Sequence, residues 1–121
     1  MSASADFIAH LIELLAGLGP VQTRRMFGGA GLYADGVMFA LIIDDVLYLK
    51  ADDATLATFA QAGMAPFTYD AKGRSVATSY WRAPERLYDE QDDMCEWART
   101  AIAAARRAQS RKPTAKTSRR R

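Results

Sequence analysis

A glycine-rich segment offers the first candidate for chemistry in this 121-residue chain. Residues 29–34 fit a loosened dinucleotide-binding pattern, G-x-G-x-x-A, in which amides at the start of a helix hold a pyrophosphate. That chemistry requires the glycines to follow a strand and to open a helix. Here they lead into Asp35-Gly36, a pair that favours a tight hairpin turn. We therefore expect a glycine-bent strand or bulge that lets another backbone approach closely, rather than a phosphate site.

Acidic side chains at helical spacing are a second candidate, because several carboxylates on one helix face could bind a hard cation. These side chains are Asp89, Asp92, Asp93 and Glu96. No histidine flanks them and no calcium-loop pattern contains them, so a solvated helix face is the favoured interpretation. The aspartate pairs at 44–45 and 52–53 stand where turns and helix caps are expected, which leaves no general acid–base pair.

The single histidine and the single cysteine limit the remaining chemistry. One cysteine excludes an internal disulfide and a Cys-based zinc site, and it fits a reducing cytoplasm. Cys95 lies on the apolar side of a predicted helix, so we expect a buried, inert thiol. His10 lies off the apolar stripe of its own helix, which indicates a surface side chain. We expect no catalytic residue, no metal site, no cofactor and, with no apolar run of about 20 residues, no membrane span.

Charge is distributed unevenly along the chain, although its formal net charge is only +2. Residues 106–121 carry eight basic side chains and no acidic one, so residues 1–105 carry a net charge of −6. The segment from 109 to 121 has no large apolar residue, and we expect it to be a disordered basic tail.

Such a tail can bind nucleic acid by releasing counterions from phosphates, or it can be solvated or rest against the acidic body. Two adjacent arginines form a second basic spot on that body. The possible nucleic-acid contacts are Arg24, Arg25, Arg106, Arg107, Arg111, Lys112, Lys116, Arg119, Arg120 and Arg121.

The spacing of apolar residues predicts the elements that position these side chains. Helical spacing predicts a first helix over 4–17, and Pro84 begins the longest helical pattern, which runs to 108. Three strands are expected between 22 and 51, and two more at 67–69 and 75–80. A short helix over 54–62, with Leu56 and Phe59 facing inward, separates the two groups. The order α-β-β-β-α-β-β-α favours an α+β fold with an antiparallel five-stranded sheet flanked by helices.

Three aromatic residues in the second half of the chain allow two interpretations. Tyr80-Trp81 and Trp97 could anchor a partner, because tyrosine and tryptophan are enriched at binding hot spots. Packing between the sheet and the long helix is the favoured role.

The run from Arg24 to Tyr33 resembles the opening signature of the TfoX/Sxy N-terminal domain family. Further matching features are the segments 36–40 and 47–50, Phe67 with Tyr69, Tyr80-Trp81 ahead of Pro84, and Trp97 on the closing helix. Together they span residues 7–105. The motif residues are Arg24, Arg25, Met26, Phe27, Gly28, Gly29 and Gly31.

The resemblance implies a secretion-chaperone-like α+β domain over residues 1–108, often dimeric, and no catalytic residues. Full-length family members are regulators of bacterial natural competence that act with the cyclic-AMP receptor protein and carry a second, helical domain. We therefore expect a non-enzymatic, cytoplasmic regulatory domain that binds another protein, for which the transcription machinery is one candidate. The alternative is a nucleic-acid-binding accessory protein that acts through the basic tail. The resemblance and the apolar strand 37–43 together predict a homodimer.

Overall fold

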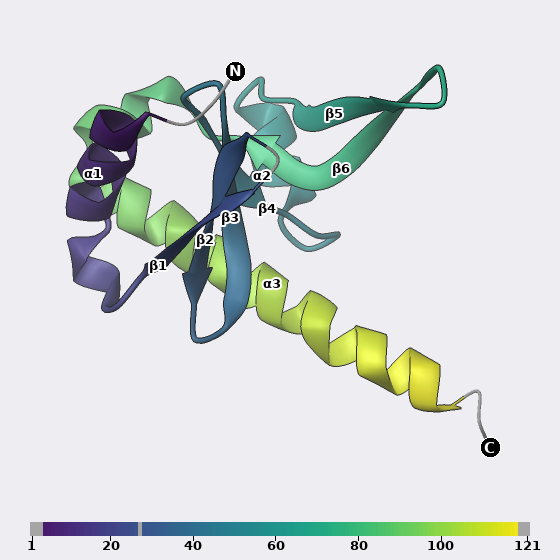
Figure 1. The fold of residues 1–121 in the computed structure, drawn as a ribbon. Helices are drawn as coiled ribbons and strands as arrows, with labels where there is room; N and C mark the ends of the chain where they lie inside the picture. The colour runs from purple at the N-terminus through teal and green to yellow at the C-terminus, as the bar shows by residue number, and fades with distance from the viewer. Residues whose placement is uncertain (1–3, 27, 119–121) are drawn as a thin grey trace.

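A six-stranded antiparallel sheet with helices packed against it forms the body of the molecule (Figure 1). The computed structural model describes residues 4–26 and 28–118, with side chains up to residue 110. The spatial order of the strands is β1-β2-β3-β4-β6-β5. Their bounds are β1 Gln22–Met26, β2 Gly29–Ala34, β3 Val37–Ile43, β4 Val46–Lys50, β5 Pro66–Ala71 and β6 Arg74–Arg82. The α+β class is confirmed, while the likeness to secretion chaperones stays a prediction.

The predicted strand count of five is wrong, because the first predicted strand is two strands. Gly28 has a φ of 77°, a left-handed conformation that suits glycine, and it turns the chain back on itself. Met26 of β1 consequently pairs with Gly29 of β2. A glycine pair in a sequence is compatible with a bend or a reversal, and here the chain reverses.

The hairpin turns follow the prediction from Asp35-Gly36. Both residues have positive φ, 52° and 81°, as a type I′ turn requires. Asp44 and Asp45, at 53° and 57°, form the next turn in the same way. Lys72 and Gly73 repeat the pattern between β5 and β6.

The two shorter helices lie within their predicted ranges. Helix α1, Ala5–Leu14, begins after Ser4, whose Oγ accepts a hydrogen bond from the Phe7 amide at 3.1 Å. Helix α2, Leu56–Gln61, buries Phe59, which is 2% exposed. The prediction that Leu56 faces inward is wrong, since its side chain is 38% exposed. A helix of six residues makes fewer than two turns, and Phe59 is its one buried residue.

The long C-terminal helix begins later than predicted. Pro84 precedes a 3-10 helix, η2, over Glu85–Asp89, and Glu90 then has an extended backbone with φ −129° and ψ 88°. Helix α3 spans Gln91–Ser118 and projects past the sheet in Figure 1. It therefore passes through residue 108, the predicted end of the domain. The division into a domain and a tail stays a prediction, and residues 119–121 lie outside the described residues.

The core lies between α3 and the central strands. The predicted seam is confirmed: its members are 6% exposed or less, and they are Leu87, Met94, Ala98, Ala101 and Ala105. Aromatic rings of three elements meet at Phe59, which contacts Trp81 and Trp97 with centroids 6.1 and 5.1 Å away. These contacts bear out the core-packing interpretation of both tryptophans.

The remaining predictions on single residues also hold. Cys95 is 5% exposed, and its Sγ donates a hydrogen bond to the Leu14 carbonyl at 3.3 Å. His10 is exposed.

Strand Val37–Ile43 lies in the interior of the sheet, and most of its side chains are buried within this chain. Its apolar residues are therefore accounted for without contact with a second copy of the chain. None of the helices in residues 4–118 is long and apolar enough to cross a membrane.

Candidate interaction surface

The helices cover one face of the sheet and leave the other open. Residues directly opposite each other on neighbouring strands share a face. Ala30 pairs with Ile42, and Ile42 pairs with Leu47; all three are fully buried in the core under α3. A second row pairs residues across five strands of the other face, which we call the open face. This row is Arg24, Gly31, Leu41, Tyr48 and Arg82.

Aromatic and methionine side chains fill the open face around Gly31. A Cβ added to Gly31 would lie 2.6 Å from the Met38 Sδ, 3.1 Å from the Met26 Cε and 3.3 Å from a Tyr33 ring carbon. The Arg24 guanidinium lies over the Tyr33 ring, 5.3 Å from its centroid. Because Gly31 has no side chain, the side chains of Met26, Tyr33 and Met38 can pack over its backbone.

Further rings lie on the other half of the sheet. Tyr48 packs against Phe67 of β5 with centroids 5.2 Å apart. Lys50 pairs with Tyr80, and the Lys50 ammonium lies 5.2 Å from the centroid of the Tyr80 ring. All four of these side chains are half-buried, so their rings and cation are partly accessible to a ligand.

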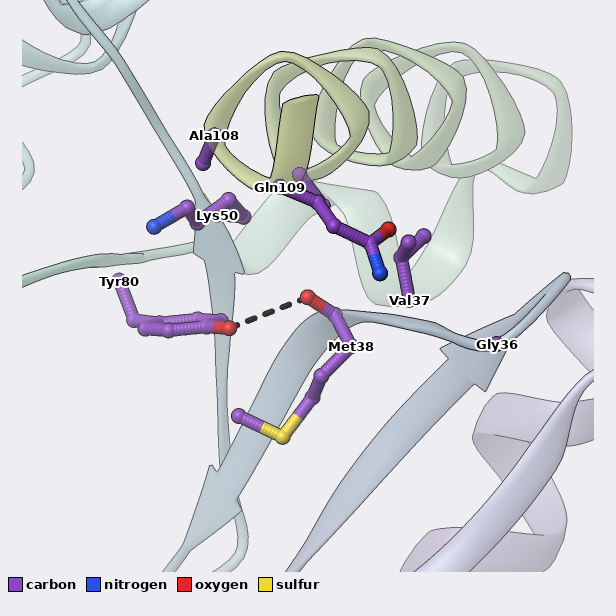
Figure 2. A pocket seen from close by; sticks show the side chains of 8 residues that line it. Gly36, Val37, Met38, Lys50, Tyr80, Ala108 and Gln109 are labelled. Carbon is purple, nitrogen blue, oxygen red and sulfur yellow. Dashed lines mark hydrogen bonds between the residues drawn. The ribbon is translucent and has the colours of Figure 1, made fainter. Parts of the chain in front are cut away.

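The Tyr80 side chain extends from β6 past Lys50, the last residue of β4, to reach β3. Its hydroxyl donates a hydrogen bond of 3.0 Å to the Met38 carbonyl, while Lys50 lies between it and α3 (Figure 2). Burial, with a smaller contribution from the Tyr33 phenol, raises the pKa of Tyr80 to about 12. The hydroxyl therefore remains a donor at neutral pH. Beside it is a shallow pocket of about 200 Å³ lined by Gly36, Val37, Met38, Lys50, Tyr80, Ala105, Ala108 and Gln109.

The open face is basic on a body that is otherwise acidic. The cations that the strand register places on it are Arg24, Lys50, Arg82 and, farther along β6, Arg74; the three arginines are exposed. Among the residues that the strand register places on this face, none is acidic. Local positive charge therefore coincides with the aromatic side chains.

The predicted nucleic-acid contacts fall into three groups. Arg24 and Arg25 are exposed on β1, at the edge of the sheet. Arg106 and Arg107, at the start of the basic segment 106–121 and just before the predicted tail, are ion-paired with the body. The side chains of Arg111, Lys112, Lys116, Arg119, Arg120 and Arg121 lie outside the described residues.

The ion pairs join α3 to the ends of two strands. Arg106 pairs with Asp35 in the β2–β3 turn. Arg107 donates two hydrogen bonds to the Asp52 carboxylate, at 2.6 and 3.1 Å. These bonds hold the pKa of Asp52 below its usual value. For these two arginines the structure supports the interpretation that the basic segment rests against the acidic body.

The acidic helix face is partly neutralised by arginine. Arg86 bridges Glu90 and Asp93 at 2.6 and 2.8 Å, and it lowers the pKa of Asp93. Glu96 lies 3.7 Å from Arg99. In the part of the chain that the structure describes, no group of three or more His, Cys, Asp or Glu side chains could hold a metal ion.

The glycine motif belongs to a strand, as expected. A Cβ on Gly29 would lie 2.0 Å from the Ile42 carbonyl oxygen, so β3 approaches β2 at a distance that suits only glycine. Strand β2 ends in a hairpin and opens no helix, whereas the pyrophosphate pattern requires a helix after the glycines.

The open face was not predicted from the sequence. The period-two spacing of Arg24 with Met26, and of Gly31 with Tyr33, is nevertheless a signal that these side chains share a sheet face.

The antiparallel sheet, the closing helix and the glycine-rich hairpin define a small α+β domain with one open sheet face. The family model of the TfoX N-terminal domain matches residues 13–105. The chain therefore belongs to the TfoX N-terminal domain family, as its motif residues predicted, and the match includes every strand of the open face.

Two relatives place the chain within this family. Protein Sxy of Escherichia coli (strain K12) is 31% identical over 102 residues, which cover 84% of this chain and 49% of Sxy. DNA transformation protein TfoX1 of Aliivibrio fischeri is 32% identical over 68 residues, covering 56% of this chain and 32% of TfoX1. The chain spans at most about half the length of these relatives.

Proposed function

We propose that the chain is a non-enzymatic regulatory domain that binds another protein in competence-type control of transcription. The observation that carries this proposal is the similarity to E. coli Sxy over 84% of the chain. The name of the second relative, DNA transformation protein TfoX1, agrees with it.

The roles of the motif residues support a regulatory domain over an enzyme. Gly28 reverses the chain, Gly29 admits the Ile42 carbonyl, and Gly31 makes room for methionine and tyrosine side chains. The family signature thus builds a sheet surface rather than an arrangement of reacting groups. Tyrosine, arginine and methionine are common on surfaces that bind proteins.

A chimaera tests this proposal in cells. The full chain is fused ahead of the C-terminal half of Sxy and expressed in an E. coli strain that lacks Sxy and carries a competence-promoter reporter. We expect reporter activity to return, because the chain would replace the matching half of Sxy. The control is the same fusion with Gly29→Ala, which we expect to disrupt the fold because the added Cβ would lie 2.0 Å from the Ile42 carbonyl oxygen. A soluble, folded fusion at normal abundance that leaves the reporter silent would contradict the proposal.

Binding to a partner can be measured directly. Purified cyclic-AMP receptor protein is the first partner to test, by biolayer interferometry with the full chain immobilised. Saturable binding supports the proposal, and its absence in the presence of cyclic AMP argues against this partner.

A second candidate is an accessory protein that binds nucleic acid through its basic tail. The eight basic residues of 106–121 favour it. Because Arg106 and Arg107 are paired with Asp35 and Asp52, binding would depend on the six basic residues after 110. Binding that weakens steeply with salt and disappears on truncation at residue 110 would support this function.

A further inference from the structure

The open face combines two features that bind single-stranded nucleic acid: positive charge and accessible aromatic rings. Proteins of this kind track the backbone with cations and stack bases on aromatic side chains. Arg24 and Arg82 stand at the two ends of a row that crosses five strands. We propose that the open face binds single-stranded nucleic acid, with phosphates at the arginines and bases on the tyrosines.

The size of the row suits a short stretch of single strand. Neighbouring strands are about 4.8 Å apart, so four steps from Arg24 to Arg82 span roughly 19 Å. Gly31, Leu41 and Tyr48 occupy the middle of the row and leave it uncharged. Gly31 and Leu41 are buried, so the half-buried Tyr48 ring provides the ligand contact between the two guanidinium groups.

The rings are held in place before a ligand arrives. Tyr80 is fixed by its hydrogen bond to the Met38 carbonyl, and Tyr48 is packed against Phe67. Tyr33 lies beneath the Arg24 guanidinium. A preorganised surface loses little side-chain entropy on binding. A guanidinium above a ring also brings a phosphate-binding group close to a stacking surface.

Charge complementarity selects a polyanion, and the rings select an unpaired strand. The acidic residues of the body lie on helices, in turns and on β5, and none occupies a registered position on this face. A duplex keeps its bases stacked inside, so the tyrosines of a sheet face could not reach their flat surfaces. An acidic protein segment would satisfy the cations but would not need the rings.

The inference is independent of the regulatory proposal and of the basic tail. The side chains that carry it lie between residues 24 and 82, whereas the basic segment begins at residue 106 and the predicted tail at residue 109. Loss of reporter activity in a chimaera would leave this binding intact, and loss of this binding would leave the family assignment intact.

Fluorescence anisotropy with the full chain tests the inference. The probes are labelled oligo-dT and oligo-rU of about 20 nucleotides and a DNA duplex of equal length, which suit site sizes of about 4–16 nucleotides. Three variants are compared with the unchanged chain across a salt series. They are Arg24→Gln with Arg82→Gln, Tyr33→Leu, and the control Lys72→Gln with Arg99→Gln.

The control removes the same charge from two exposed residues away from the open face, Lys72 in the β5–β6 turn and Arg99 on α3, the helix that covers the opposite face. Circular dichroism establishes that each variant is folded. It also shows whether Tyr33→Leu disturbs the packing around Gly31, and the Arg24/Arg82 variant, which changes only exposed side chains, serves as the independent test.

The expected result is tighter binding of either single strand than of the duplex by tenfold or more. Removal of Arg24 and Arg82 should reduce the slope of log affinity against log salt by about 1.4, since each phosphate contact contributes about 0.7. Tyr33→Leu should weaken binding at least fivefold, the lower end of a stacking contribution of about 1–3 kcal/mol. The control variant should bind as the unchanged chain does. A preference between oligo-dT and oligo-rU would identify the polymer.

Three results would overturn the inference. The control variant could lose as much affinity as the Arg24/Arg82 variant, or the duplex could bind as tightly as the single strand. Thirdly, polyglutamate could displace the oligonucleotide while Tyr33→Leu leaves the affinity for the oligonucleotide unchanged. That result would show that the open face binds acidic proteins.

Discussion

Three glycine-to-alanine substitutions test whether the family motif is structural. At Gly29, an added Cβ would lie 2.0 Å from the Ile42 carbonyl oxygen, which belongs to the backbone of an interior strand and cannot move aside. Overpacking of this kind costs about 3 kcal/mol. For a chain of this length, a melting temperature lower by roughly 12 °C, or failure to fold, follows from about 4 °C for each kcal/mol.

Gly31 should be more tolerant, although its added Cβ also meets close neighbours. The nearest atom, 2.6 Å away, is the Met38 sulfur, and the next is the terminal methyl of Met26 at 3.1 Å. Methionine side chains have three rotatable bonds and can repack. Gly31→Ala should therefore cost about 1 kcal/mol, near the low end of overpacking.

Gly17→Ala is the matched control. Its Cβ would lie 3.5 Å from the Cys95 sulfur, an ordinary contact, and the change should alter stability by no more than about 0.5 kcal/mol. Thermal and guanidinium unfolding of the full chain, followed by circular dichroism, measures all three. The reasoning is refuted if Gly29→Ala unfolds at the same temperature as Gly17→Ala. It is also refuted if Gly31→Ala abolishes reporter activity in the chimaera without any loss of stability, because the motif would then contact a partner.

Further predictions concern titration and assembly. Arg107 lowers the pKa of Asp52, so this stabilisation is present above the unfolded carboxyl pKa and is lost as the pH falls through the lower folded value. Asp52→Asn should therefore reduce the difference in melting temperature between about pH 7 and pH 3. Tyr80 has a pKa of about 12, so the absorbance titration of the folded chain should contain a tyrosine phase near that value that Tyr80→Phe removes. Because that pKa is raised, Tyr80 should favour the folded state less as the pH rises above the ordinary value of 10.0. We propose a homodimer on the resemblance, and light scattering should give twice the mass of one chain; the mass of one chain would refute it.

Local chemistry made much of the fold predictable from the sequence. The turn at Asp35-Gly36 needs positive φ at two successive positions, and residue type alone indicates it. The seam of α3 follows from helical periodicity, which depends only on the spacing of Met94, Ala98 and Ala101. These features hold whatever the rest of the chain does.

The open face could not be predicted in the same way, because it depends on register. A shift of one residue moves every side chain of a strand to the opposite face. The pairing of β2 with β3 is irregular between Leu32 and Tyr33, and Phe39 and Ala40 are consequently both buried in the core. The apolar run of β3 conceals this irregularity. Which residues share a face with Arg24 therefore follows only from the assembled sheet.

The tail and the open face make separable contributions to nucleic-acid binding. Truncation at residue 110 removes six basic side chains, which contact phosphates without regard to base stacking. It should reduce the salt slope for single strands by up to about 4, since each contact contributes about 0.7. The preference for single strand over duplex should remain, because it depends on the rings of Tyr33, Tyr48 and Tyr80. Anisotropy of the truncated chain with both probes measures the two effects together. If truncation removes the preference as well as the slope, the tail is the site and the open face is not.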